Sequence, residues 1–174
     1  MKRPRRPSGD DHRQRIIDAM LALAARDGWR AVTLNSLTAE TGLKLVDVYD
    51  HFPSKHAVLA AFLDEIDRSV LAGTTAAASS DPPRDRLFDI MMRRFDALHP
   101  HKKAITAIVR DSLADPLSYL CGAPRFLQSM AAMLDAADLG SAGCAGAVKT
   151  KGLALIYLNA FRVWLRDDTP DMSK

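Results

Sequence analysis

The chain has 174 residues, of which 48% are hydrophobic and 26% are charged. It is long enough to bury one core or two small ones, and it is too apolar to be disordered. The formal net charge is +3, and four cations lie within the first six residues, so the remainder carries +3 − 4 = −1 and any basic surface must be local.

No segment of the sequence predicts a membrane span or a secretory signal. No apolar run approaches the roughly 18 residues that a spanning helix needs, and the N-terminal stretch MKRPRRPSGDDHRQR is polar. We therefore expect a cytoplasmic protein. Cys121 and Cys144 have no CxxC pairing and no histidine cluster nearby, which indicates two buried thiols in place of a disulfide or a zinc site.

Helical periodicity predicts three helices in the first third of the chain. Apolar residues recur at three- and four-residue spacing through residues 11–27, and Gly28 supplies a left-handed stop. Thr33 can cap a second short helix that ends at Gly42, the tight turn that a helix-turn-helix needs. A third helix then runs over about residues 45–51.

The third helix has a packed side and an exposed side. Its helical wheel assigns four residues to the packed side: Leu45, Val48, Tyr49 and Phe52. It assigns four others to the exposed side: Val46, Asp47, Asp50 and His51. Because this stretch contains two aspartates and no Lys or Arg, its charge is opposite in sign to that expected next to phosphate.

Seven residues of this region agree in order and spacing with a known signature: Thr33, Gly42, Tyr49, His51, Phe52, Ser54 and Lys55. Over about residues 12–65 the chain resembles the N-terminal domain of the TetR family of bacterial regulators. The resemblance implies an all-α fold, with a helix-turn-helix DNA-binding head of three helices over residues 10–53. A helical bundle over residues 54–174 would bind a small effector and form a homodimer.

The resemblance also implies a DNA-binding surface, for which a double-stranded operator is the expected partner. The candidate residues are Thr33, Lys44, Val46, Asp47, Tyr49, Asp50, His51 and Lys55. Where the family usually has Ser or Thr before the third helix, this chain has Lys44. The basic arm of residues 2–6 could follow the DNA backbone or remain a solvated tail.

Further helices follow a small, proline-ended loop over residues 74–83. Asp115-Pro116 is expected to break one of them, and Pro124 is expected to split the next. Methionine- and phenylalanine-rich stripes fit either core packing or an apolar pocket for an acyl or isoprenoid effector. The candidate pocket residues are Phe88, Met92, Phe95, Phe126, Met130 and Met133. The candidates to bind a polar end of the ligand are Arg93, Arg94 and Arg110.

The last long helix is expected over about residues 145–166. The resemblance places the dimer interface on such a helix, and the same stripe fits an ordinary core helix equally well. The candidate interface residues are Leu158, Phe161, Trp164 and Leu165. Thr169 and Pro170 look like a helix start just before the sequence stops, which predicts a chain cut short.

The tail YLNAFRVWLRDDTPDMSK carries a second, shorter resemblance. It is similar to ubiquinone-biosynthesis accessory proteins, which share the TetR-like fold, bind lipid or isoprenoid, and do not bind DNA. No Gly-rich phosphate loop, nucleophile motif or metal-ligand spacing supports catalysis, and no cofactor or metal is expected. The sequence favours a repressor released by a small apolar effector, with the lipid-binding accessory protein as the alternative.

Overall fold

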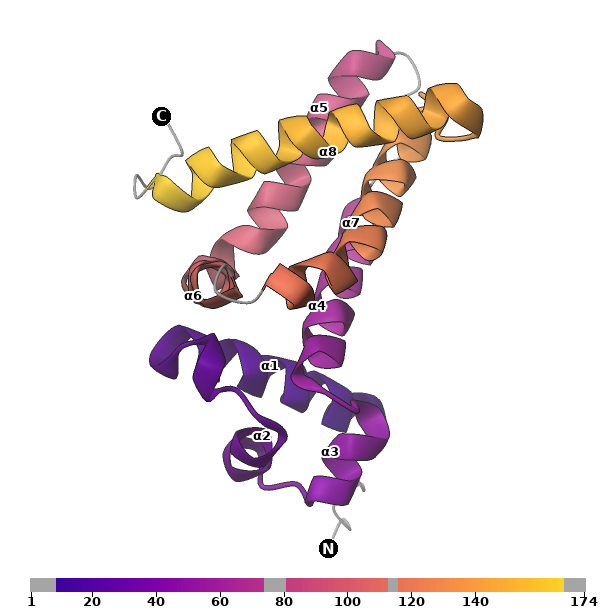
Figure 1. Cartoon of the computed structure of the whole chain (residues 1–174). Helices are drawn as coiled ribbons and strands as arrows, with labels where there is room; N and C mark the ends of the chain where they lie inside the picture. The colour runs from indigo at the N-terminus through magenta and orange to yellow at the C-terminus, as the bar shows by residue number, and fades with distance from the viewer. Residues whose placement is uncertain (1–8, 74–80, 113–115, 168–174) are drawn as a thin grey trace, which may run out of the picture. The chain divides into compact units, whose positions relative to one another are not determined.

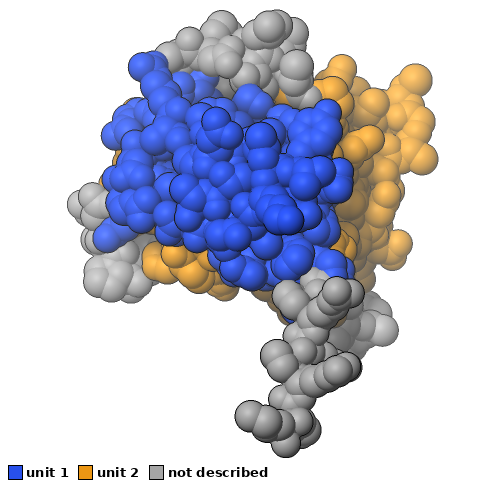
Figure 2. Space-filling model, turned by 90° about the horizontal axis from the view of Figure 1, so that it is seen from below, with its two compact units in different colours: residues 1–65, 103–114 blue, residues 66–102, 115–174 orange. Residues whose placement is uncertain are grey.

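The structure of the chain is a computed structural model that describes residues 9–73, 81–112 and 116–167 (Figure 1). Throughout these ranges the regular structure is helical, which confirms the predicted all-α fold. The chain divides into two compact units (Figure 2). Unit 1 comprises residues 1–65 and 103–114, and unit 2 comprises residues 66–102 and 115–174. The functional division after residue 53 remains a prediction.

Unit 1 contains six helical elements or parts of them among the described residues. They are α1 (Gly9–Asp27), the 3-10 helix η1 (Trp29–Ala31), α2 (Leu34–Thr41), α3 (Leu45–His51), the start of α4 (Lys55–Ala72) and nearly all of α6 (Lys102–Ser112). Helix α1 contacts η1 and α2, and α2 contacts α3. The most deeply buried side chains of this core are Ile16, Ile17, Met20, Val32, Leu37, Val48 and Val58.

Helix α6 is tied to η1 by the carboxylate of Asp111. Asp111 Oδ2 accepts hydrogen bonds from the backbone N–H groups of Trp29 at 2.9 Å and Arg30 at 3.4 Å. The hydrogen bond from Arg110 lowers the pKa of Asp111, and the two backbone donors lower it further. The first donors of the short helix η1, which have no partner within that helix, are thus satisfied by a residue about 80 positions later in the chain.

The ring of Trp29 extends this junction to the start of α4. Lys55 Nζ lies 4.7 Å from the centroid of the Trp29 ring and donates a hydrogen bond to the Trp29 carbonyl at 3.0 Å. His56 meets the same ring edge-on, with the centroids 5.7 Å apart. Cation–π contact and hydrogen bonding together hold Lys55 in place. We call the set Trp29, Lys55 and Asp111 the Trp29 junction.

Unit 2 is a bundle built from the remaining helices. They are the end of α4, α5 (Pro83–Leu98), the 3-10 helix η3 (His99–His101), α7 (Pro116–Ala136) and α8 (Gly143–Arg166). Helix α7 contacts both α8 and α5. The core consists mainly of Ile90, Phe95, Leu98, Met130, Met133, Leu134, Leu153, Tyr157 and Trp164.

Several local predictions were wrong. Pro124 does not split its segment, because α7 continues through it; the proline removes one backbone hydrogen bond without ending the helix. Cys144 is exposed, and the side chain of Cys121 lies outside the description. Residues 74–80, the arm of residues 2–6 and Thr169 also lie outside the described ranges.

The Trp29 junction depends on a glycine at position 28. Gly28 has φ 87° and ψ 163°, a backbone conformation that is restricted almost entirely to glycine. A Cβ atom there would also lie 3.1 Å from Asp111 Oδ2. Gly42 has φ 69°, but a Cβ atom at that position would meet no neighbour within 4 Å. A substitution at Gly42 therefore introduces backbone strain alone, whereas one at Gly28 introduces strain together with crowding against Asp111.

We expect Gly28→Ala to lower the free energy of unfolding by about 3 kcal/mol, because the strain of the ψ 163° conformation adds to the contact with Asp111. The matched control Gly42→Ala should cost about 1 kcal/mol, because only left-handed backbone strain applies there. Urea unfolding followed by circular dichroism measures both. Equal losses for the two variants would contradict the role assigned to the junction.

Candidate functional site

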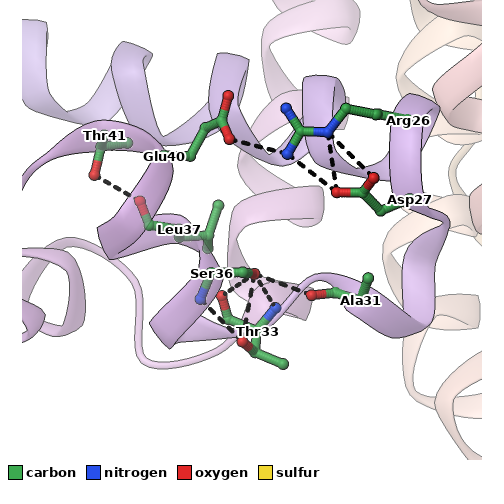
Figure 3. A network of polar contacts seen from close by, with 8 residues as sticks. All are labelled: Arg26, Asp27, Ala31, Thr33, Ser36, Leu37, Glu40 and Thr41. Carbon is green, nitrogen blue, oxygen red and sulfur yellow. Dashed lines mark hydrogen bonds and ion pairs between the residues drawn. The ribbon is translucent and has the colours of Figure 1, made fainter.

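Helix α2 begins with a reciprocal cap. Thr33 Oγ1 accepts a hydrogen bond from the Ser36 N–H at 3.0 Å, and Ser36 Oγ accepts one from the Thr33 N–H at 2.8 Å (Figure 3). Ser36 Oγ also donates to the Ala31 carbonyl at 3.0 Å. These bonds satisfy N–H groups that a helix start leaves unpaired. Thr33, a candidate DNA-binding residue, therefore has a structural role in the start of α2.

The turn between α2 and α3 is fixed at both its backbone and its side chains. Gly42 is left-handed, and its N–H donates to the Thr38 carbonyl at 2.8 Å. Thr41 Oγ1 donates to the Leu37 carbonyl at 2.7 Å (Figure 3). From α1, Arg15 donates to the carbonyl of Thr41. The direction in which the chain enters α3 is thus determined by α1 and α2 together.

Few side chains hold α3 in the core of unit 1. Val48 is completely buried, and Phe52, which follows the helix, is almost so. The guanidinium of Arg13 lies 5.1 Å from the Phe52 ring centroid. His51 is half-buried and meets His12 of α1 edge-on, with 6.1 Å between the ring centroids. A face of α3 is therefore left for other contacts.

That free face differs from the predicted one. Leu45 is 49% exposed, Val46 58% and Tyr49 57%, so the expectation that Leu45 and Tyr49 pack inward was wrong. A helix of seven residues makes under two turns, and Val48 with Phe52 already fills its contact with the core. Asp50 is exposed as predicted, whereas Asp47 is half-buried.

The remaining DNA-binding candidates divide into two groups. Lys44 is exposed and precedes α3 without a side-chain cap, so its ammonium is available to a partner. The ammonium of Lys55 contacts the carbonyl and the ring of Trp29, which gives Lys55 a structural role in the Trp29 junction. By helical spacing, Val46, Tyr49 and Asp50 share one face of α3, next to Lys44. The structure thus brings four of the eight candidates together.

Aromatic rings from three helices meet in unit 2. Tyr157 of α8 stacks on Phe95 of α5 at 5.3 Å and on Phe161 at 5.7 Å, and Phe126 of α7 lies tilted against it at 5.7 Å. Phe161 stacks in turn on Trp164 at 5.4 Å. We call these five residues the aromatic cluster. The Nε1 donor of Trp164 is buried and has no hydrogen-bond partner among the described residues.

A buried arginine lies beside the aromatic cluster. Arg94 Nε donates to the Tyr157 hydroxyl at 3.1 Å, Nη1 donates to Ser129 Oγ at 3.0 Å, and the guanidinium pairs with Asp67 of α4. Burial raises the pKa of Tyr157, so its hydroxyl stays protonated at neutral pH. Because Asp67 neutralises Arg94 within the chain, this arginine serves the fold of unit 2 first.

The six candidate pocket residues do not form one surface. Met130, Met133 and Phe95 are buried, Phe126 is half-buried, and Phe88 and Met92 are exposed on α5. The three candidate arginines all have partners within the chain: Arg93 donates to the Gly73 carbonyl, Arg94 pairs with Asp67, and Arg110 pairs with Asp111. The contribution of Tyr157 and Trp164 to a shared cluster was not predicted from the sequence.

The exposed apolar residues of α8 also differ from the predicted set. Leu155 is 71% exposed and Ile156 66%, and Val148, Leu158 and Val163 are exposed as well. Of the predicted interface residues, Trp164 is buried within its own chain, and Phe161 and Leu165 are half-buried. At 100° per residue, Leu155 and Val148 lie opposite the buried Leu153 and Tyr157, and the other exposed apolar residues flank them.

Comparison with known proteins identifies the helix-turn-helix. Residues 16–62 match the family described as bacterial regulatory proteins, tetR family, and this range contains α2, its turn and α3. Over these residues the head is similar to the TetR family. This confirms the resemblance seen in the sequence. No described helix is long and apolar enough to span a bilayer, and no group of three His, Cys, Asp or Glu residues in the described ranges could hold a metal.

Related proteins extend the likeness only in part. Over 78 residues the chain is 32% identical to the transcriptional repressor KstR of Mycolicibacterium smegmatis, covering 44% of this chain and 38% of that protein. Over 81 residues it is 30% identical to the transcriptional regulator EthR of the same species, covering 47% of this chain and 37% of that protein. The matched region thus spans well under half the length of these relatives.

Solved structures support the fold of the TetR-like head and bundle. The TetR transcriptional regulator from Nitrosomonas europaea superposes with a TM-score of 0.77 at 23% identity, covering 92% of this chain and 88% of that one. A TetR transcriptional regulator from Rhodococcus sp. RHA1 gives 0.66 at 22% identity, with coverages of 95% and 91%. In the tail that resembles the accessory proteins, Trp164 and Asp167 are buried, and Asp168, Pro170 and Asp171 lie outside the described residues.

Proposed function

We propose that the chain is a homodimeric transcriptional repressor that binds a DNA operator through α3 and is released by a small apolar effector held in unit 2. The observation that carries this proposal is the coincidence of the TetR-family match with a helix-turn-helix whose second helix has a free face. The relation to proteins named as a repressor and a transcriptional regulator supports the same function.

The negative charge of α3 is expected to weaken its affinity for unrelated DNA while still permitting specific base contacts. Asp50 is exposed on the face that would meet the duplex, and its carboxylate repels phosphate. A carboxylate can still accept a hydrogen bond from a base amino group in the major groove. Affinity must then come from cations outside α3, namely Lys44 and the basic N-terminal sequence of residues 2–6. We propose specific binding with weak affinity for unrelated DNA.

The direct test is a genome-wide selection of DNA by the full-length chain, followed by fluorescence anisotropy at several salt concentrations. Asp50→Asn should strengthen binding to unrelated DNA about fivefold at low salt, which corresponds to about 1 kcal/mol of relieved repulsion.

Deleting residues 1–7 should weaken binding to all sequences and flatten the salt dependence. If wild type shows no sequence-selective binding, the repressor proposal fails and the lipid-binding accessory function replaces it.

Helix α8 supplies the proposed dimer interface. Its exposed side carries several large apolar side chains, headed by Leu155 and Ile156, which would be costly to leave in water. Leu158 belongs to this face, with the half-buried Phe161 and Leu165 beside it. We therefore centre the interface on Leu155 and Ile156, and we assign Trp164 to the aromatic cluster of its own chain.

We expect Ile156→Asp to give a folded monomer, because an unpaired charge at the centre of an apolar interface opposes association while leaving the core of unit 2 intact. The matched control is Phe88→Asp, an equally drastic change at an exposed position of α5, and it should remain a dimer. Sedimentation velocity distinguishes the two. A wild-type protein that is already monomeric at micromolar concentration would rule out this interface.

The effector is proposed to lie against the aromatic cluster and the buried methionines Met130 and Met133. Thioether and aromatic side chains adapt to apolar ligands, and the buried Trp164 Nε1 can donate to one acceptor atom of the ligand. Since the arginines named above are already paired within the chain, we propose an acyl or isoprenoid molecule with a neutral oxygen in preference to a strongly anionic one.

Native mass spectrometry of protein purified from cells should detect a hydrophobic passenger. Trp164→Phe keeps an aromatic ring and removes the donor, so it should weaken binding of a long-chain alcohol about tenfold, about 1.4 kcal/mol. The corresponding alkane, which accepts no hydrogen bond, should bind both proteins alike. If no acyl or isoprenoid lipid binds at any concentration, the apolar effector is excluded.

A further inference from the structure

The free face of α3 is largely apolar, although the helix also contains two aspartates. Leu45 and Tyr49 are four residues apart, and Val46 and Tyr49 are three apart, so the three side chains lie together on the helix surface. Each has about half or more of its surface in solvent. Asp50, four residues after Val46, lies at the border of this patch. We call Leu45, Val46 and Tyr49 the α3 patch.

The composition of α3 restricts which bases it can read. Guanine is read most often by Arg or Lys, and adenine by the two-pronged amide of Asn or Gln. The sequence LVDVYDH contains none of these residue types. Its histidine, His51, is half-buried against His12. Among the major-groove features of the bases, the C5-methyl group of thymine is the one that an aliphatic or aromatic side chain complements.

We propose that the α3 patch specifies thymine, with Leu45, Val46 and Tyr49 packing against thymine methyl groups in the major groove. This inference rests on the proposed DNA-binding function. The patch lies on the second helix of the helix-turn-helix, within the residues that match the TetR family. An A·T pair presents a methyl group and an adenine amino donor together, and Val46 with Asp50 offers the two matching groups four residues apart.

The test removes one methyl group at a time from the DNA. In the operator obtained by selection, each thymine is replaced in turn by uracil, which keeps its base-pairing edge and its O4 acceptor. We expect at least one substitution in each half-site to weaken binding about fourfold, the change that corresponds to about 0.8 kcal/mol for one buried methyl group. Thymines outside the protected region serve as controls and should show no effect.

The protein variants identify which side chains read the methyl. Leu45→Ala, Val46→Ala and Tyr49→Ala change exposed side chains, so each should fold normally, and at least one should bind the thymine and uracil duplexes with equal affinity. The control Lys44→Ala should weaken binding to both duplexes by the same factor and leave their ratio unchanged. Circular dichroism and sedimentation check the fold and assembly of each variant.

The possible outcomes separate this inference from the function on which it rests. A selected operator that binds equally well with uracil at every position, or that has no thymine in its protected region, overturns thymine readout and leaves the repressor intact. A uracil effect that persists in all three alanine variants also overturns it, because DNA shape would then be the cause. If no sequence-selective binding is found, both proposals fail.

Discussion

The hydrogen bonds from the Trp29 and Arg30 backbone to Asp111 are the contact on which the order of unit 1 depends. They hold η1 against α6, and the Trp29 ring in turn holds Lys55 at the start of α4. Because folding lowers the pKa of Asp111, this carboxylate stabilises unit 1 fully above its unfolded pKa of about 3.9. The stabilisation is lost as the pH falls through the lower, folded value.

Local signals in the sequence predicted much of the fold but not this contact. Thr33 and Gly42 predicted the limits of α2, because an N-cap and a left-handed glycine stop depend on the identity of single residues. The hydrogen bond from the Trp29 N–H to Asp111 spans 82 positions, and sequence periodicity cannot predict a contact between residues so far apart. For the same reason the sequence did not predict the partners of Arg94, which are Asp67, Ser129 and Tyr157 from three separate helices.

The sequence predicted the bounds of α3 but not which of its side chains are exposed. The helical wheel wrongly assigned Leu45 and Tyr49 to the core, because burial is the usual fate of such a stripe. How many residues of the stripe the core can accept depends on the helices of unit 1 that pack against α3, and of these residues only Val48 and Phe52 are buried. On α8 the opposite error occurred. Trp164 was predicted to lie in a dimer interface, and it packs within its own chain.

The membership of α6 in unit 1 limits how such a protein can be divided or recombined. The chain passes between the two units at residues 65/66, 102/103 and 114/115, so unit 1 is not one continuous segment. A fragment that ends within α4, after residue 62, would keep the family-matched residues 16–62 and lose Asp111. A chimera that grafts this head onto another regulator's bundle must therefore also carry over the α6 segment that caps η1.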